Sequence, residues 1–215
     1  ALENSEYKDY YNEVTVHGGS YAPSYYDPAY SYAASVVDDF YIPNGYPALH
    51  LNYHGGKIER KADNDLFLKN IGAIFNTNRQ KLGADAGIAI STTANATNLY
   101  IDVDVKSAKV QTYYVAVWVL ENNIASPNQN GATLDRHRVA NHALRYIASD
   151  YSSSYMLGDS LGVLTVNQVA GKSYTVPINS NWVVNNLEVL VIVSDDTDVV
   201  NTAVCPVNAT KDYEY

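Results

Sequence analysis

From about residue 86 to the end of the chain, apolar residues recur with the two-residue period of β-strands. Between 99 and 105, Leu, Ile and Val alternate with polar residues, which predicts a strand with one buried and one solvated face. The run from 113 to 120 is apolar at consecutive positions, so we expect a central strand that is covered on both faces. Further strands are predicted at 161–166, 174–178 and 187–193. Short strands without long helices between them are typical of an antiparallel β-sandwich.

The first third of the chain mixes helix and strand signals. Asp27-Pro28 is a typical helix start, and the apolar residues Ala33, Val36, Val37 and Phe40 then follow at helical spacing. Strands are predicted at 13–17 and 48–53, on either side of this helix. A second helix is predicted with a buried stripe at Phe67, Ile71, Ile74, Phe75 and Leu82. We therefore predict a mixed α+β chain with two domains, 1–85 and 86–215.

One segment of the second part is ambiguous. Val139, Ala143, Tyr146 and Ile147 match helical spacing, whereas the neighbouring pattern is that of strands. Periodicity alone predicts a helix here.

Composition and charge limit the classes of function. The chain has 215 residues with a formal net charge of −9, and its 14 basic residues are scattered, which argues against binding to nucleic acid. It has 20 Tyr but only 3 Phe. Tyrosine is amphipathic, so it suits both half-buried strand positions and surfaces that contact sugars or proteins. The early tyrosines Tyr21, Tyr25, Tyr26 and Tyr30 are the candidate binding residues.

An ordered set of short motifs resembles a known family. In the second part these are Val-Trp-Val-Leu-Glu-Asn at 117–122, His-Ala-Leu-Arg at 142–145, Gly158-Asp159 and the apolar run 189–193. With Val-Thr-Val-His-Gly-Gly at 14–19 and Gly-Tyr-Pro at 45–47, they resemble the outer membrane protein twenty-eight-related family of Bacteroidota. The resemblance implies a surface or outer-membrane lipoprotein in which a thioredoxin-like portion precedes an immunoglobulin- or fibronectin-like sandwich.

The resemblance also carries expectations for single residues. It implies a cis-proline turn at Pro47, and it places residues 142–145 in a sandwich strand, against the helical spacing. His142 and Arg145 are then expected to form structural hydrogen bonds or an ion pair. The reactive Cys-x-x-Cys of thioredoxin-like folds would lie before Ala1, so we expect the N-terminal part of that portion to be missing and the chain to be processed or truncated.

Candidate sites for chemistry are few. Gly158-Asp159-Ser160-Leu161 matches a serine hydrolase motif, but no histidine follows His142 to serve as its base. We expect a turn before a strand, with O-glycosylation of Ser160 as an alternative. Asn95-Ala96-Thr97 and Asn208-Ala209-Thr210 have the form of N-glycosylation acceptors, but we expect ordinary turns.

The spacing of the possible ligand residues does not match a regular metal or redox motif. Asp195, Asp196 and Asp198 could supply oxygen ligands to Ca²⁺, although a solvated turn has the same composition. Asp102 and Asp104 share one strand face and are expected to be solvated. The histidines do not form a zinc pattern, and Cys205 lies in an apolar run, so we expect it to be buried and inert. We therefore expect no cofactor.

The sequence favours a non-catalytic binding or scaffold module at the cell surface or outer membrane. The favoured partner is a protein or a surface protein assembly, and membrane attachment is expected only through a lipid anchor outside this chain. The alternatives are a thiol oxidoreductase whose Cys-x-x-Cys lies upstream of the chain, and a glycan-binding surface protein.

Overall fold

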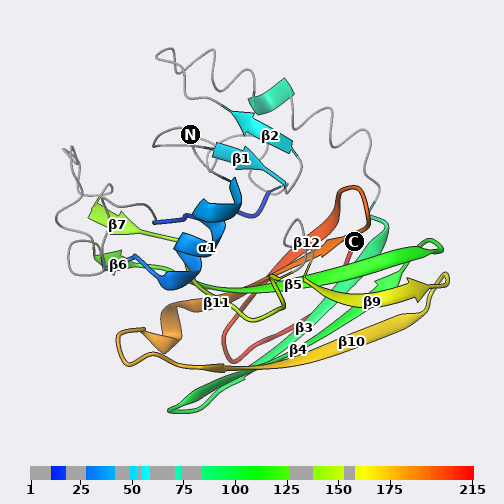
Figure 1. Cartoon of the computed structure of the whole chain (residues 1–215). Helices are drawn as coiled ribbons and strands as arrows, with labels where there is room; N and C mark the ends of the chain where they lie inside the picture. Colours follow the sequence, from blue (N-terminus) through cyan, green and yellow to red (C-terminus); the bar gives the residue numbers. More distant parts are fainter. Residues whose placement is uncertain are drawn as a thin grey trace.

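Two antiparallel β-sheets lie face to face in the computed structural model (Figure 1). The structure describes residues 11–17, 28–41, 49–52, 55–58, 71–73, 84–125, 138–152 and 158–215. Strands dominate these residues, and the two sheets enclose one shared core.

The first sheet has four strands in the order β10-β4-β3-β13. Their bounds are β3 Ala86–Ala94, β4 Asn98–Ser107, β10 Val169–Pro177 and β13 Thr210–Glu214. The β3–β4 connection is a tight turn, in which the Asn95 side-chain oxygen accepts hydrogen bonds from the backbone N–H groups of Thr97 and Asn98, both at 2.8 Å. The Asn95 motif is thus a turn, as expected.

The second sheet has the strand order β12-β11-β5-β8, with β9 paired to the other end of β5. The bounds are β5 Gln111–Glu121, β8 Ala143–Ile147, β9 Asp159–Leu164, β11 Leu187–Ser194 and β12 Val199–Pro206. Two hairpins and a 3-10 turn complete the set: β1 Leu49–Leu51 with β2 Gly55–Ile58, β6 Ile124–Ala125 with β7 Val139–Ala140, and η4 Val184–Asn186.

The core between the sheets follows the predicted alternation. In β4, the odd-numbered residues from 99 to 105 are buried, and Tyr100, Asp102 and Asp104 are exposed. Residues 115–121 of β5 are buried on both faces, as predicted for a central strand. The inner-face residues of β4, β5 and β11 form one cluster with those of β3 and β12.

The helix α1, Tyr32–Tyr41, covers the outer face of the five-stranded sheet (Figure 1). Its buried residues Ala33 and Val37 pack against Trp118, Leu190 and other outward residues of β5, β8, β11 and β12. The predicted helix is confirmed, but its first residue is later than expected. Ser31 provides the cap, because its hydroxyl accepts a hydrogen bond from the Ala34 backbone N–H at 3.3 Å.

The expected thioredoxin-like portion is wrong. The described residues before 85 form α1, one hairpin, a helical piece at 71–73 and an extended segment at 11–17. That extended segment pairs with the sandwich itself, since Thr15 bridges Ala143 of β8 in parallel. The apolar residues of α1 and of the extended segment pack against the five-stranded sheet: Ala33, Val36, Val37, Val14 and Val16. The second predicted helix lies mostly outside the described residues, which include only Ile71 of its predicted stripe. The first strand of the sandwich begins at Ala86, and the two predicted domains stay a prediction.

The ambiguous segment is a strand. Residues 143–147 form β8, which pairs with residues 118–121 of β5, as the family resemblance implied and against the helical spacing. Leu144 and Ile147 both lie in the outer cluster with α1 and residues 14–16, because the register shifts by one residue at Arg145. Burial on both faces removed the two-residue alternation that identifies a half-buried strand.

Candidate binding face and the residues that support it

A buried ion pair joins two strands of the five-stranded sheet. Arg145 on β8 donates from Nε to Glu121 Oε2 on β5 at 2.6 Å, and both side chains are almost fully buried. Glu121 Oε1 also accepts from the Val183 backbone N–H at 2.8 Å. A buried ion pair is tolerated when its remaining polar atoms also have hydrogen-bond partners. The Val183 N–H is such a partner for Glu121.

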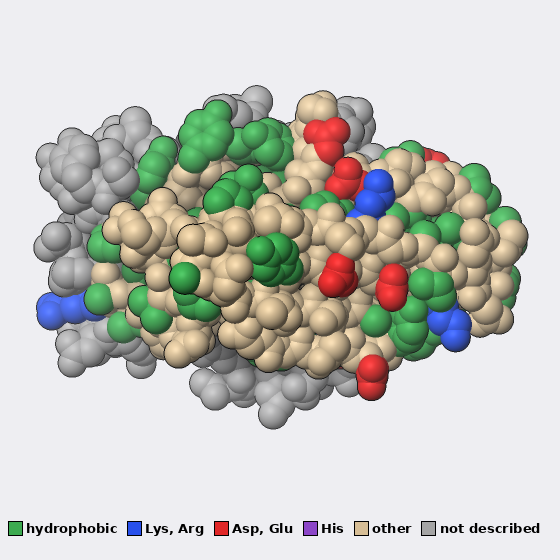
Figure 2. Space-filling model, turned by 90° about the horizontal axis from the view of Figure 1, so that it is seen from below, with side chains coloured by type: hydrophobic (Ala, Val, Ile, Leu, Met, Phe, Trp, Pro, Cys, Tyr) green, Lys and Arg blue, Asp and Glu red, His purple; other side chains and the backbone are tan. Residues whose placement is uncertain are grey.

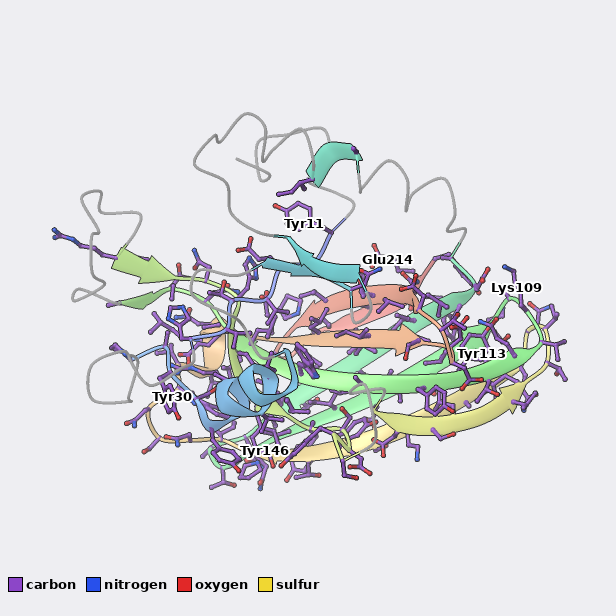
Figure 3. The ribbon with its side chains drawn as sticks, turned by 45° about the horizontal axis from the view of Figure 1, so that its top comes forward. Tyr11, Tyr30, Lys109, Tyr113, Tyr146 and Glu214 are labelled. Carbon is purple, nitrogen blue, oxygen red and sulfur yellow. The ribbon has the colours of Figure 1, made fainter. Side chains whose placement is uncertain are left out.

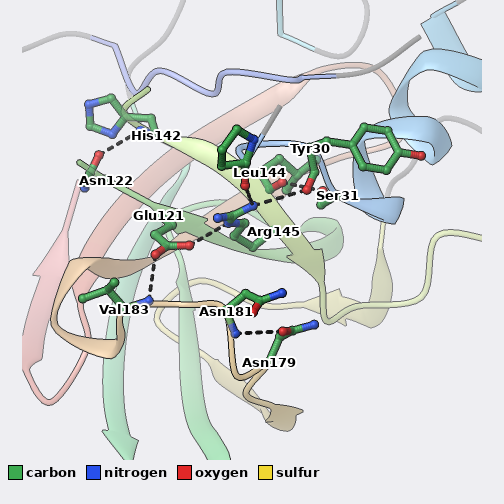
Figure 4. Close-up of polar contacts among 11 residues, drawn as sticks. Tyr30, Ser31, Glu121, Asn122, His142, Leu144, Arg145, Asn179, Asn181 and Val183 are labelled. Atoms are coloured by element: carbon green, nitrogen blue, oxygen red, sulfur yellow. Dashed lines mark hydrogen bonds and ion pairs between the residues drawn. The ribbon is translucent and has the colours of Figure 1, made fainter. Parts of the chain in front are cut away.

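The same pair holds the segment before α1 (Figure 4). Arg145 Nη1 donates to the carbonyl oxygens of Pro28 at 2.8 Å and Tyr30 at 3.3 Å. The Ser31 hydroxyl donates to the Leu144 carbonyl at 2.5 Å. One charged network thus ties the segment before α1, β8, β5 and the loop before η4 together.

His142 forms a second pair beside this network. Its Nδ1 lies 2.5 Å from Glu188 Oε1, and its backbone N–H donates to Asn122 Oδ1 at 2.8 Å (Figure 4). The expectation that His142 and Arg145 form ion pairs and structural hydrogen bonds is therefore confirmed.

The outer face of the four-stranded sheet presents a row of polar side chains along β4. We call Tyr100, Asp102, Asp104 and Lys106 the β4 row. Two of them have hydrogen-bond partners: Asn95 Nδ2 donates to the Tyr100 hydroxyl at 3.3 Å, and Ser173 Oγ donates to Asp102 Oδ1 at 2.5 Å.

The other two members of the β4 row lie against β10 and β13. The Asp104 carboxylate lies over Gly171 of β10, where an added Cβ would overlap its Oδ1. The Lys106 ammonium lies 5.8 Å from the centre of the Tyr213 ring, within the range of a cation–π contact.

At the Lys106 end of the β4 row, a second tyrosine, Tyr215, lies on the backbone of β3. A Cβ built at Gly87 would come within 2.6, 2.8 and 3.0 Å of Cζ, Cε1 and Cε2 of Tyr215. The ring therefore rests on a position that only glycine leaves open, while 57% of Tyr215 stays exposed. Burial, and then the charge of Asp104, raise the pKa of Tyr213 above its usual value.

The space-filling view from below looks onto this outer face (Figure 2). It shows uncharged polar and apolar side chains with isolated acidic groups and few basic ones. Around the β4 row the neighbouring positions are small: Ala89, Ser91, Thr93, Gly171, Ser173 and Thr175. The face is therefore a shallow surface of rings, carboxylates and hydroxyls.

The edge strands of this sheet carry charges that oppose further strand pairing. Lys172 of β10 pairs with Val103, so it lies on the core-facing side of the edge strand although it is exposed. Lys211 of β13 pairs with Ile90 on the same side and binds the Val204 carbonyl at 3.2 Å. Inward charges on edge strands oppose pairing with another chain, so contact by strand addition is disfavoured at these edges.

Four of the predicted site residues lie outside the described residues: Tyr21, Tyr25, Tyr26 and Pro47. Tyr30 is half-buried at the start of α1 (Figure 3), where its carbonyl accepts from Arg145. Tyr30 thus has a clear structural role, and its role in binding stays a prediction.

The acidic turn at 195–198 does not gather its carboxylates. Asp195 Oδ1 accepts from the backbone N–H groups of Thr197 and Asp198, whereas Asp196 Oδ1 accepts from the Tyr114 hydroxyl at 2.9 Å. In the part of the chain that the structure describes, no three His, Cys, Asp or Glu side chains are grouped to hold a metal ion. The geometry gives the calcium alternative no support.

The hydrolase-like motif is a strand entry. Gly158 has a φ of +71°, and Asp159 Oδ2 accepts from the Tyr174 hydroxyl at 2.8 Å. Ser160 is exposed, and its hydroxyl accepts from the Gly162 backbone N–H at 3.2 Å. Three of the four motif residues therefore lie within β9 itself rather than in a turn before it, and O-glycosylation of the exposed Ser160 stays a prediction.

Cys205 is 1% exposed in β12, and burial raises the pKa of its thiol. Since the thiolate is the reactive species, we expect Cys205 to react with Ellman's reagent only after unfolding. Absorbance of the released thiolate in buffer and in guanidinium chloride measures this. Rapid reaction of the native protein would show that the strand opens.

Sequence reasoning missed the pairing of Glu121 with Arg145 and the tyrosines on β13. A charged residue that ends an apolar run, as Glu121 does after 113–120, is a signal for a buried pair. Nothing in the pattern near Tyr213 and Tyr215 pointed to β3, because β13 reaches it from the other end of the chain.

Comparisons with known proteins give one informative match. No curated protein matches this chain. Two solved structures are β-glucosidases in complex with glucose. The enzyme from Kluyveromyces marxianus is 13% identical with a TM-score of 0.31, over 60% of this chain and 14% of that one. Enzyme 3B from Thermotoga neapolitana is 8% identical with a TM-score of 0.34, over 84% of this chain and 20% of that one. The chain spans a small part of both enzymes, and likenesses this weak carry no argument.

Within the described residues, the helices are too short or too polar to span a membrane. The model of the family described as outer membrane protein Omp28 matches residues 34–211. That range runs from α1 to β13, so it includes the ion pair, the β4 row and both sheets. The chain therefore belongs to the Omp28 family of outer membrane proteins, which locates it at the outer membrane or cell surface.

Proposed function

We propose that this protein is a non-catalytic binding or scaffold module, and that it makes contact through the outer face of the four-stranded sheet. The single observation that carries the proposal is the β4 row, in which Tyr100, Asp102 and Lys106 each contact a neighbour on the β3–β4 turn, β10 or β13. Fixed side chains lose little entropy on binding, which favours recognition.

The buried charges support the non-catalytic part of the proposal. Glu121 and Arg145 form the buried ion pair of the described residues, and their polar atoms bind each other and backbone groups. They hold segments of the chain together. The thiol oxidoreductase alternative is not carried forward, because it rested on the thioredoxin-like portion.

The partner favoured by the sequence is a protein or a surface assembly, and a glycan is the second candidate. The experiment for the shared proposal uses cell-envelope material, which contains both. The purified chain and its Tyr100→Ala/Asp102→Ala variant are incubated with washed envelopes, and the retained fraction is measured. We expect retention of the wild type and a loss of about tenfold in the variant, since removing one or two good contacts costs about 1.4 kcal/mol or more.

Tyr151→Ala is the matched control, because Tyr151 is also an exposed tyrosine, 46% exposed, but lies outside the four-stranded sheet. It should be retained like the wild type. Equal retention of all three proteins, or none of any, would contradict binding through this face.

A further inference from the structure

We propose that the outer face of the four-stranded sheet binds a neutral glycan chain laid along β4. This inference rests on the proposed function and names its ligand class. Its elements are tyrosine rings at both ends of the β4 row, two carboxylates between them, and small residues that keep the surface flat.

The rings are placed to stack on sugar residues. Tyr100 is 42% exposed at one end of the row, and Tyr213 and Tyr215 are 38% and 57% exposed at the other end. Pyranose rings have an apolar C–H face, which the flat, amphipathic face of tyrosine covers well. From Tyr100 to Lys106 the strand rises about 20 Å at about 3.3 Å per residue, a length that fits several linked sugars.

The carboxylates between the rings are acceptors for sugar hydroxyls. Asp102 and Asp104 are exposed, and an ionised carboxylate can accept several hydrogen bonds at once. Ser173 already orients Asp102, and the Asp104 carboxylate rests over Gly171. A sugar chain therefore meets two exposed acceptors, of which Asp102 is already oriented by Ser173.

The composition of the face favours a glycan over a protein. The centres of protein interfaces are rich in apolar, aromatic and Arg side chains and poor in Asp, Ser and Ala. Here Ala89, Ser91 and Ser173 lie around two aspartates. A protein would have to desolvate both carboxylates, whereas sugar hydroxyls replace the water around them directly.

The charge of the face and of the chain selects neutral polymers. Two carboxylates face one lysine in the β4 row, and the whole chain carries −9. Anionic polysaccharides would be repelled by this potential. We therefore commit to unsubstituted hexose chains.

The test uses isothermal titration calorimetry with the full chain and four hexasaccharides: cellohexaose, maltohexaose, laminarihexaose and β-1,4-mannohexaose. At least one should bind, and its disaccharide should bind about tenfold or more weakly, because it reaches only one end of the row. Polygalacturonate serves as the anionic comparison and should not bind.

Three variants locate the site. Tyr100→Ala, Asp102→Asn and Gly87→Val should each weaken hexasaccharide binding about tenfold; the last displaces the Tyr215 ring without removing it. If Gly87→Val lowers the melting temperature, Tyr215→Ala removes the same ring at an exposed position. Tyr151→Ala should bind like the wild type.

Two outcomes overturn the inference. One is a folded wild type that binds none of the four neutral series. The other is hexasaccharide binding that all the face variants retain. The envelope-retention experiment then separates the two proposals. If pretreating the envelopes with protease abolishes retention and pretreating them with periodate does not, the partner is a protein; this result contradicts the glycan proposal but still supports the binding face. Loss after periodate alone supports the glycan.

Discussion

Replacing Gly158 by alanine should prevent the protein from folding stably. Gly158 is buried at the entry to β9 with a φ of +71°, a conformation that costs an L-residue about 1–2 kcal/mol. A Cβ there would also overlap the Val115 carbonyl and lie 2.8 Å from Ala116 Cα. Both contacts are with the backbone of the central strand β5, which cannot yield. We expect a loss above about 4 kcal/mol, measured by urea unfolding, or a melting temperature lowered by about 10 °C or more.

Gly162→Ala, four residues further on and within β9, is the matched control. Gly162 has a similar φ of +74°, but nothing lies within 4 Å of its added Cβ. This variant should therefore lose only the conformational cost of about 1–2 kcal/mol. Equal losses in the two variants would show that the backbone conformation alone matters, and that β9 does not approach β5 as closely as described.

Breaking the buried ion pair should have the second large effect. Glu121→Ala leaves the Arg145 guanidinium buried with carbonyl partners only, and it also removes the acceptor of the Val183 N–H. Removing one partner of a buried pair costs about 3–5 kcal/mol. Urea unfolding should show this loss, and Arg145→Ala should show a similar one.

The exposed pair between Lys109 and Asp85 is the comparison (Figure 3 labels Lys109). Its N–O distance is 2.7 Å, but the Lys109 side chain is 62% exposed, and exposed pairs contribute less than about 1 kcal/mol. Lys109→Ala should therefore have little effect. A Glu121→Leu/Arg145→Met double variant should lose less than the sum of the single losses, because no unpaired charge remains. Full additivity would mean that the pair is not coupled.

The strands of the sandwich could be predicted from sequence because their faces differ in solvation. In β4 the alternation of apolar and polar residues identifies both the strand and its buried face. In β5 the continuous apolar run gives a strand covered on both sides. What covers the outer side could not be deduced from these strands, since periodicity reports burial but not the covering element.

The wrong prediction of a thioredoxin-like portion in the first third arose because local periodicity does not identify the covering element. The amphipathic stripe of α1 was a correct local prediction, and the strand predicted at 13–17 is an extended segment with one bridge, at Thr15. Both need an apolar surface, and a separate thioredoxin-like sheet was the assumed one. The five-stranded sheet provides it instead, through Trp118, Leu144 and Leu190. Local pattern does not choose between two such surfaces.

The candidate site was only half visible in the sequence. A solvated pair of Asp102 and Asp104 follows from strand alternation alone. The ring of Tyr215 on Gly87 and the Lys106–Tyr213 contact depend on a pairing between β3 and β13, which are more than a hundred residues apart, so no local signal announces them.

The contacts of α1 and of β13 join segments that are far apart in the sequence, which affects how fast the chain can fold. Residues 33 and 37 pack with residues of β5, β8, β11 and β12, between about 80 and 165 positions further along the chain, and β13 forms the edge beside β3 from more than a hundred residues away. Contacts of such high sequence separation slow folding. We therefore expect refolding on a scale of about milliseconds to seconds, as is usual for β-sandwiches.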